Sequence, residues 1–147
     1  MATLPEAIEL QIVTPERHVL QATVQSVEIP GKEGYLGVLP GHAPLITELG
    51  VGILAYREGT ENHFLTVING YAEVLPDRVI VLAEISEKAE EIDVERSRAA
   101  QNRAQVELAK AGVGSEEWQR EKLALDRALI RMQAASRTGA TAGGGQH

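Results

Sequence analysis

The feature that most constrains the fold of this chain is a change of composition near Ser86. All 6 prolines and most of the glycines and β-branched residues precede it, whereas Ala, Glu, Arg and Gln dominate after it. Proline and glycine punctuate short strands, and alanine and straight-chain residues favour helices. The sequence therefore predicts an α+β protein with a β domain at residues 1–86, a helical domain at 87–137 and a disordered tail at 138–147.

Short apolar runs separated by turn residues predict seven or more strands before Ser86, at a spacing typical of a sandwich or barrel. Gly50 and Gly52 are expected to separate two of these strands. Asn69 followed by Gly70 is the strongest hairpin signal in the chain.

After Ser86, two helical patterns are joined by a short turn, which predicts an antiparallel hairpin. Asp93 and Ser115 are the expected N-caps, and Gly112 is expected to end the first helix in a left-handed conformation. Small residues form one stripe of the first helix. The main apolar stripe of the second helix is expected to contain Trp118, Leu125, Leu129 and Met132.

Residues 30–45, PGKEGYLGVLPGHAPL, form the most constrained loop of the chain. Glycine permits positive φ and proline fixes φ, so this backbone has few free angles. Its apolar side chains indicate a shaped turn that presents a surface. Two interpretations of His42 stay open at this point: a proton-active imidazole, or a loop histidine hydrogen-bonded to a neighbour or a partner chain.

Composition excludes several functions. A formal net charge of −7 disfavours nucleic acid or anionic lipid as the main partner. The absence of cysteine excludes disulfides and thiolate chemistry. No catalytic or metal-binding motif is present, so we expect neither an enzyme acting alone nor a metal site.

No signal peptide is recognisable, and the aliphatic run at residues 79–83 is far shorter than the ~20 residues that span a bilayer. We expect a soluble chain that reaches a membrane only through another protein.

Four arginines share the facing sides of the two predicted helices. Arg96 and Arg103 lie on one face of the first helix, and Arg127 and Arg131 lie four residues apart on the second. In an antiparallel pair these guanidiniums can converge on a polyphosphate. The alternative is a solvated face balanced by neighbouring carboxylates.

Residues 34–44, GYLGVLPGHAP, fit the pattern G-x-L-G-x-x-P-x-H-A-P and resemble the signature of the ε subunit of F-type ATP synthases. The segments IELQIVTPER at 8–17 and INGYAEVLPDRVIVLAE at 68–84 extend the resemblance over nearly the whole chain. The resemblance implies a β-sandwich of about ten strands, then a two-helix hairpin. It also implies a non-catalytic rotor subunit that couples proton translocation to ATP synthesis.

The resemblance further implies partners and a location. The sandwich would bind the γ subunit and the c-ring, and the extended hairpin would reach the α/β catalytic ring and block ATP hydrolysis. The chain would lie on the cytoplasmic face of the bacterial inner membrane as part of the complex, without inserting into the bilayer. The residues implied to contact γ and the c-ring are Glu33, Tyr35, Leu39, Gly41, His42, Ala43 and Pro44.

Some members of this family bind a regulatory ATP on the folded hairpin through an I-D-x-x-R-A motif. Residues 92–97 read IDVERS, so Ser97 stands where the motif has alanine. By similarity, the residues facing adenine would be Glu87, Ile92, Asp93 and Ser97, and those facing the phosphates would be Arg96, Arg103, Arg127 and Arg131. No other cofactor is implied.

Two other functions are compatible with parts of the chain. A free-standing ATP-binding sensor would explain the arginines but not the loop. A carbohydrate- or peptide-binding sandwich would explain the β domain, although such sites usually expose aromatic side chains and aromatic content here is only 3%. Co-purification with a γ-like chain would separate the rotor subunit from both.

Overall fold

The computed structural model describes the backbone of residues 4–142 and the side chains of residues 4–137. The chain divides into two compact units after Lys88, close to the boundary expected at Ser86. The first unit contains seven strands: β1 (Ile8–Val13), β2 (His18–Val24), β3 (Ser26–Gly31), β4 (Gly34–Val38), β5 (Leu45–Glu58), β6 (Glu61–Leu75) and β7 (Arg78–Lys88). The second contains the short 3₁₀ helix η1 (Ala89–Glu91) and the helices α1 (Val94–Lys110) and α2 (Glu116–Ala142).

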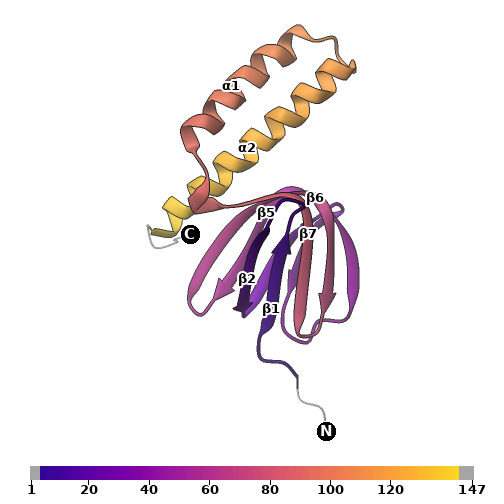
Figure 1. The fold of residues 1–147 in the computed structure, drawn as a ribbon, viewed down its shortest axis with the longest axis vertical. Coiled ribbons are helices and arrows are strands. Elements are labelled where there is room, and N and C mark those ends of the chain that lie inside the picture. Colours follow the sequence, from indigo (N-terminus) through magenta and orange to yellow (C-terminus); the bar gives the residue numbers. More distant parts are fainter. Residues whose placement is uncertain (1–3, 143–147) are drawn as a thin grey trace. The chain divides into compact units, whose positions relative to one another are not determined.

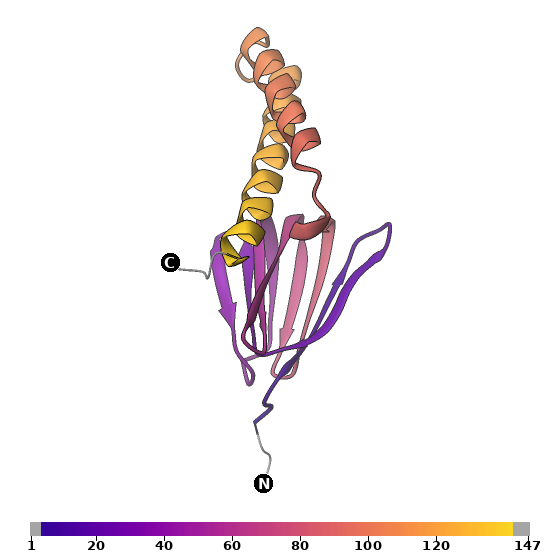
Figure 2. The ribbon, with the colours of Figure 1, turned by 90° about the vertical axis from the view of Figure 1, so that its left-hand side faces the viewer.

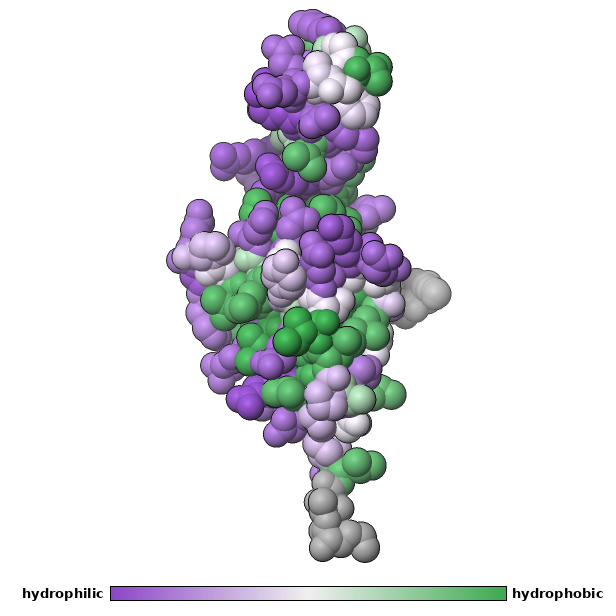
Figure 3. Space-filling model, turned by 90° about the vertical axis from the view of Figure 1, so that its right-hand side faces the viewer, coloured by the Kyte–Doolittle hydropathy of each residue, from purple (hydrophilic) through white to green (hydrophobic). Residues whose placement is uncertain are grey.

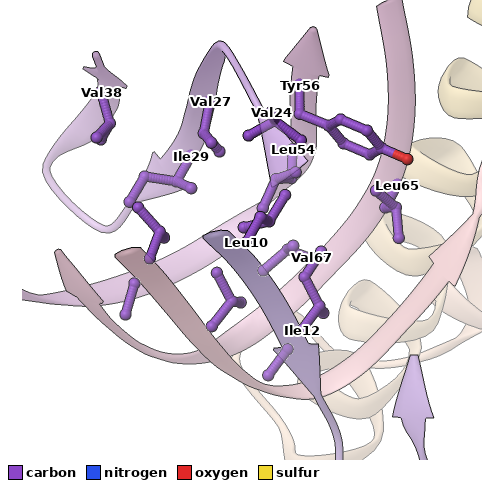
Figure 4. Packing of buried hydrophobic residues seen from close by; sticks show 14 of the residues in the cluster. Leu10, Ile12, Val24, Val27, Ile29, Val38, Leu54, Tyr56, Leu65 and Val67 are labelled. Atoms are coloured by element: carbon purple, nitrogen blue, oxygen red, sulfur yellow. The ribbon is translucent and has the colours of Figure 1, made fainter. Parts of the chain in front are cut away.

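The strands of the first unit form one sheet in the order β2-β1-β7-β6-β5-β3-β4, folded into a sandwich (Figure 1). The β1–β7 pair is parallel, and the other neighbouring pairs are antiparallel. Aliphatic side chains from all seven strands fill the interior, where they point toward one another (Figure 4). Residues at the centre of this core include Leu10, Val24, Val38, Leu54 and Val67. The predicted α+β class and sandwich are confirmed.

The strand count is seven rather than about ten, because two long strands continue through segments that resemble turns. Gly50 and Gly52 lie inside β5, and Asn69 and Gly70 lie inside β6, so the hairpin predicted at Asn69 is wrong. Asn69 has φ 57° and Gly70 has φ 124°. Asparagine and glycine tolerate positive φ, and here these φ values bend the strand without ending it. The result is a kink within the strand instead of a turn.

The kink reverses which side chains face the core. In both β5 and β6, buried core positions change from odd to even residue numbers across it. The register nevertheless continues without a slip, with Leu49 opposite Gly70 and Val51 opposite Ile68. The bend lies at paired positions of the two adjacent strands, so their pairing is kept on both sides of it. Each strand therefore continues through the bend as one strand.

The second unit is an antiparallel helical hairpin, in which α1 and α2 pack on each other (Figures 1 and 2). The Asp93 carboxylate accepts the Arg96 backbone N–H at 3.1 Å. The Ser115 hydroxyl oxygen accepts the Trp118 backbone N–H at 3.1 Å. Both predicted N-caps are therefore confirmed.

The first helix ends differently from the prediction. Ala111 is the C-cap in an extended conformation, with φ −82° and ψ 147°. Gly112 is not among the positive-φ residues, and the left-handed residue of the turn is Gly114, with φ 85°. The chain therefore leaves α1 in an extended direction at Ala111 and reverses at Gly114, three residues later.

The buried stripe of α2 is rotated relative to the predicted one. Leu129 is 40% exposed, whereas Ile130 and Ala134, four residues apart, are buried. Apolar residues cover much of this helix, so periodicity alone does not fix the centre of the buried stripe. The helix is assigned through Ala142, past the start of the predicted tail at residue 138, and residues 143–147 lie outside the described part of the chain.

Candidate functional site

The loop between β4 and β5, residues 39–44, is held by backbone hydrogen bonds. Pro40 followed by Gly41 at φ 88° is the pattern of a type II turn, and the His42 N–H donates to the Leu39 carbonyl at 3.1 Å. The Gly41 N–H donates to the Pro76 carbonyl at 2.8 Å, which ties the loop to the β6–β7 turn. The loop thus has a defined shape, as its sequence predicts.

Of the two interpretations of His42, the hydrogen-bonded loop histidine fits this structure. Its Nδ1 lies 2.7 Å from the Ala43 carbonyl oxygen. The imidazole is half-buried, while Ala43 and Pro44 are exposed beside it. Leu39, which begins the turn, is 63% exposed.

Tyr35 combines an exposed ring with an internal hydrogen bond. Its side chain is 56% exposed, yet its hydroxyl oxygen accepts the Ile53 backbone N–H at 3.0 Å. A Cβ at Gly52 would lie only 2.5 Å from that hydroxyl, so Gly52 is the residue that lets the ring lie against β5. Glu33 is exposed in the β3–β4 turn.

A second exposed surface lies on the outer face of the sheet, and no residue-by-residue prediction identified it. Residues paired across neighbouring strands point to the same face. One row crosses β5, β6, β7 and β1 through Glu48, Tyr71, Leu82 and Val13. The adjacent row on the same strands contains Ile46, Glu73, Ile80 and Gln11. We call these two rows the outer-face patch.

The outer-face patch is apolar for a solvent-facing surface. Ile46 is 70% exposed, Tyr71 56% and Leu82 54%. Figure 3 shows apolar side chains gathered on one face of the sandwich. One sequence signal could have revealed the patch: residues 79–83, VIVLA, are apolar at every position, whereas a strand with one solvated face alternates. Such a run predicts a strand covered on both faces, whereas Leu82 on the outer face of β7 is 54% exposed.

The predicted ATP-site residues are distributed over both units. Glu87 lies near the end of β7, where its backbone N–H donates to the Thr66 hydroxyl at 3.0 Å. Asp93 caps α1, and the Ser97 hydroxyl donates to the Asp93 carbonyl at 3.0 Å. Asp93 and Ser97 therefore each have a role in starting the helix, and Ile92 precedes them, half-buried.

The four arginines lie on the two paired helices. Arg96 and Arg103 are exposed on α1, and Arg127 and Arg131 are half-buried on α2. Among the described side chains, the Arg127 Nε is buried without a hydrogen-bond partner. A buried guanidinium nitrogen without an acceptor is costly, so this position favours an added acceptor.

Two further features bear on function. Within residues 4–142, no group of three or more His, Asp or Glu side chains is placed to hold a metal ion. Neither helix, over its described length, is long and apolar enough to cross a bilayer.

Comparisons with known proteins assign both units. Residues 7–89 match the family described as ATP synthase, Delta/Epsilon chain, beta-sandwich domain, and residues 90–136 match its long alpha-helix domain. The ATP synthase epsilon chain of Syntrophobacter fumaroxidans is 46% identical over 135 residues, which cover 92% of this chain and 100% of that one. The corresponding chain of Solibacter usitatus is 46% identical over 111 residues, covering 76% and 83%.

Solved structures show the same fold. A chain of the Euglena gracilis mitochondrial ATP synthase, determined with OSCP, F1 and the c-ring, aligns with a TM-score of 0.67 and 24% identity, covering 95% of this chain and 84% of that one. A chain from the central stalk and c-ring of the Tetrahymena thermophila enzyme aligns with a TM-score of 0.54 and 13% identity, covering 87% and 96%.

Proposed function

Since the chain belongs to the delta/epsilon chain family of the ATP synthases, we propose that this ε-type, non-catalytic stalk subunit couples proton translocation to ATP synthesis by joining the γ subunit to the c-ring. It works in the ATP synthase complex on the cytoplasmic face of the bacterial inner membrane. Family membership in both units sets aside a free-standing sensor and an unrelated binding sandwich.

The observation that carries this proposal is the outer-face patch. A folded chain that leaves Ile46, Tyr71 and Leu82 together in water keeps a surface that a partner would cover favourably. Covering apolar area contributes roughly 25 cal/mol per Å² before the costs of association. We assign this face to γ, and the loop at residues 39–44 to the contact with γ and the c-ring.

The test is binding of the full chain to a purified γ–c-ring subcomplex. Tyr71→Ser and Leu82→Ser each remove an exposed apolar side chain, and each should weaken binding roughly tenfold or more, as expected for anchors of an interface. Val113→Ser is the matched control, since Val113 is 88% exposed in the α1–α2 turn. Equal affinity of all four proteins would contradict the assignment of the patch.

We also propose that the hairpin inhibits ATP hydrolysis when it extends toward the α/β ring, and that a regulatory ATP favours its folded form. The support is the partnerless Arg127 Nε, together with three more arginines on the same two helices. Phosphate oxygens are strong acceptors for guanidinium groups. A ligand shifts such an equilibrium only through its different affinity for the two forms.

Calorimetric titration of the full chain with ATP tests the nucleotide site. Arg127→Ala should weaken binding about tenfold or more, since a hydrogen bond to a charged group contributes roughly 1.5–3 kcal/mol. Arg120→Ala is the control, because Arg120 lies on the same helix with 67% of its side chain exposed. No heat of binding at millimolar ATP would remove the nucleotide from the proposal and leave the arginines as a solvated or partner-facing surface.

A further inference from the structure

The hydrogen bond of His42 defines which ring nitrogen carries the proton. Nδ1 lies 2.7 Å from the Ala43 carbonyl oxygen. A carbonyl oxygen only accepts hydrogen bonds, so Nδ1 must be the donor. In the neutral imidazole the other nitrogen, Nε2, then has a free lone pair and acts as an acceptor.

The Nε2 atom of His42 is open to an incoming group. Within the part of the chain that the structure describes, it has no hydrogen-bond partner, and it is not among the buried atoms left without one. The ring is also held in place. The His42 backbone N–H donates to the Leu39 carbonyl, and the N–H of the preceding Gly41 donates to the Pro76 carbonyl. The ring itself is bonded through Nδ1 to the Ala43 carbonyl. The acceptor is therefore preoriented rather than mobile.

Exposed apolar residues lie close to His42 along the loop and beside Gly41. Leu39 is 63% exposed and Leu45 is 38% exposed. A Cβ on Gly41 would lie 3.4 Å from the Leu4 side chain, which is itself 79% exposed. A partner that covers these side chains removes water from Nε2, and an acceptor buried without a donor is costly.

We propose that His42 is a specificity-determining residue of the loop, where the neutral Nδ1–H tautomer offers Nε2 as acceptor to an N–H or O–H donor of the subunit that covers it. This inference rests on the proposed contact of the loop with the γ–c-ring subcomplex. The partner must then supply one hydrogen-bond donor framed by apolar side chains. A partner surface without that donor would leave Nε2 unpaired and would bind less well.

The tautomer is measured first, in the free full-length chain labelled with ¹⁵N in its imidazole rings. Long-range ¹H–¹⁵N correlation spectra at pH 7.5 distinguish a protonated from an unprotonated ring nitrogen. We expect protonated Nδ1 and unprotonated Nε2 for His42. An Nε2–H tautomer, or a doubly protonated ring at that pH, would overturn the proposal whatever the partner.

Two substitutions then separate the outward acceptor from the inward donor. His42→Asn keeps an N–H near the Nδ1 position but has no atom at Nε2, whereas His42→Gln can place its carbonyl oxygen near Nε2. Against the γ–c-ring subcomplex, His42→Asn should weaken binding roughly 5- to 100-fold, the range expected for leaving a buried partner donor unsatisfied. His42→Gln should recover part of that loss.

The outcomes distinguish this inference from the proposed function. Protection of the Gly41 amide from hydrogen exchange reports that the loop is intact in each variant, because that N–H is bonded to Pro76. If the wild-type chain binds tightly and His42→Asn binds with equal affinity, the proposed role of Nε2 is overturned while the proposed function stands. Failure of the wild-type chain to bind the subcomplex would overturn the proposed function, and this inference with it.

Discussion

At the scale of single residues, Gly70 decides whether β6 can lie against β7. A Cβ at this position would meet the Leu82 carbonyl oxygen at 2.0 Å, and the backbone has φ 124°. No other residue type accepts both conditions. The sequence indicated the conformational freedom of this glycine correctly but could not show that the freedom is used for a kink, because that depends on strands distant in the chain.

Gly70→Ala should destabilise the sandwich by about 2–4 kcal/mol, from the strained backbone and the clash together. Urea unfolding followed by far-UV circular dichroism measures the change. Gly37→Ala is the matched control, since Gly37 lies in β4 with no atom within 4 Å of the added Cβ and without a positive φ. Similar unfolding midpoints for the two variants would show that β7 moves away from residue 70 at little cost in free energy.

Tyr35 and Tyr71 offer a second comparison between residues, because both are 56% exposed. The Tyr35 hydroxyl accepts the Ile53 N–H, whereas no bond of the Tyr71 hydroxyl is found among the described residues. Tyr35→Phe should therefore cost about 0.5–1.5 kcal/mol of unfolding free energy, and Tyr71→Phe close to nothing. Equal urea midpoints would show that Ile53 finds another acceptor. The family resemblance predicts Tyr35 in a partner surface, but nothing in the sequence indicated this internal role.

At the scale of elements, the sequence predicted best the features that are local. The caps at Asp93 and Ser115 depend on neighbours within a few residues, and both were identified. The shaped turn expected within residues 30–45 is formed at Gly41. The outer-face patch depends on which residues of β5, β6 and β7 stand opposite one another. Register is set by the whole sheet, so a pattern read along one strand cannot supply it.

The contact between α1 and α2 is a second element-scale feature of the chain. The buried residues of α1 are small, Ser97 and Ala104, so there is little side-chain volume on this face of the helix. Ala104→Leu would force three extra carbons into that contact and should destabilise the hairpin by about 1–3 kcal/mol. Trp118 is the chain's single tryptophan and lies on α2, so its fluorescence during urea unfolding reports this unit. Asn102→Leu, at an exposed position of α1, is the control and should leave the fluorescence midpoint nearly unchanged. Identical midpoints for the two leucine variants would mean that the helices are loosely paired.

At the scale of the whole molecule, the chain is two units with separate structural requirements. The core of the first unit is built entirely from residues of β1 to β7, and the hydrogen bonds of its sheet are made within residues 8–88. A domain with its own core is expected to fold alone. The four arginines proposed for the nucleotide all lie in the second unit. We therefore propose that rotor binding and regulation lie in different parts of the chain.

A fragment of residues 1–88 should consequently fold and bind the γ–c-ring subcomplex with nearly the affinity of the full chain. Far-UV circular dichroism and a cooperative urea transition test its folding, and the same binding assay tests its contact. Assembled into the complete ATP synthase, the fragment should support proton-driven ATP synthesis, while ATP hydrolysis should rise because no hairpin can extend toward the catalytic ring.

The full chain carrying Val113→Ser is the control in each assay, since it keeps both units. A folded fragment that fails to bind would place part of the rotor contact in residues 89–147. An unchanged rate of ATP hydrolysis would show that the hairpin does not inhibit the enzyme. The proposed function would then be limited to coupling by the sandwich.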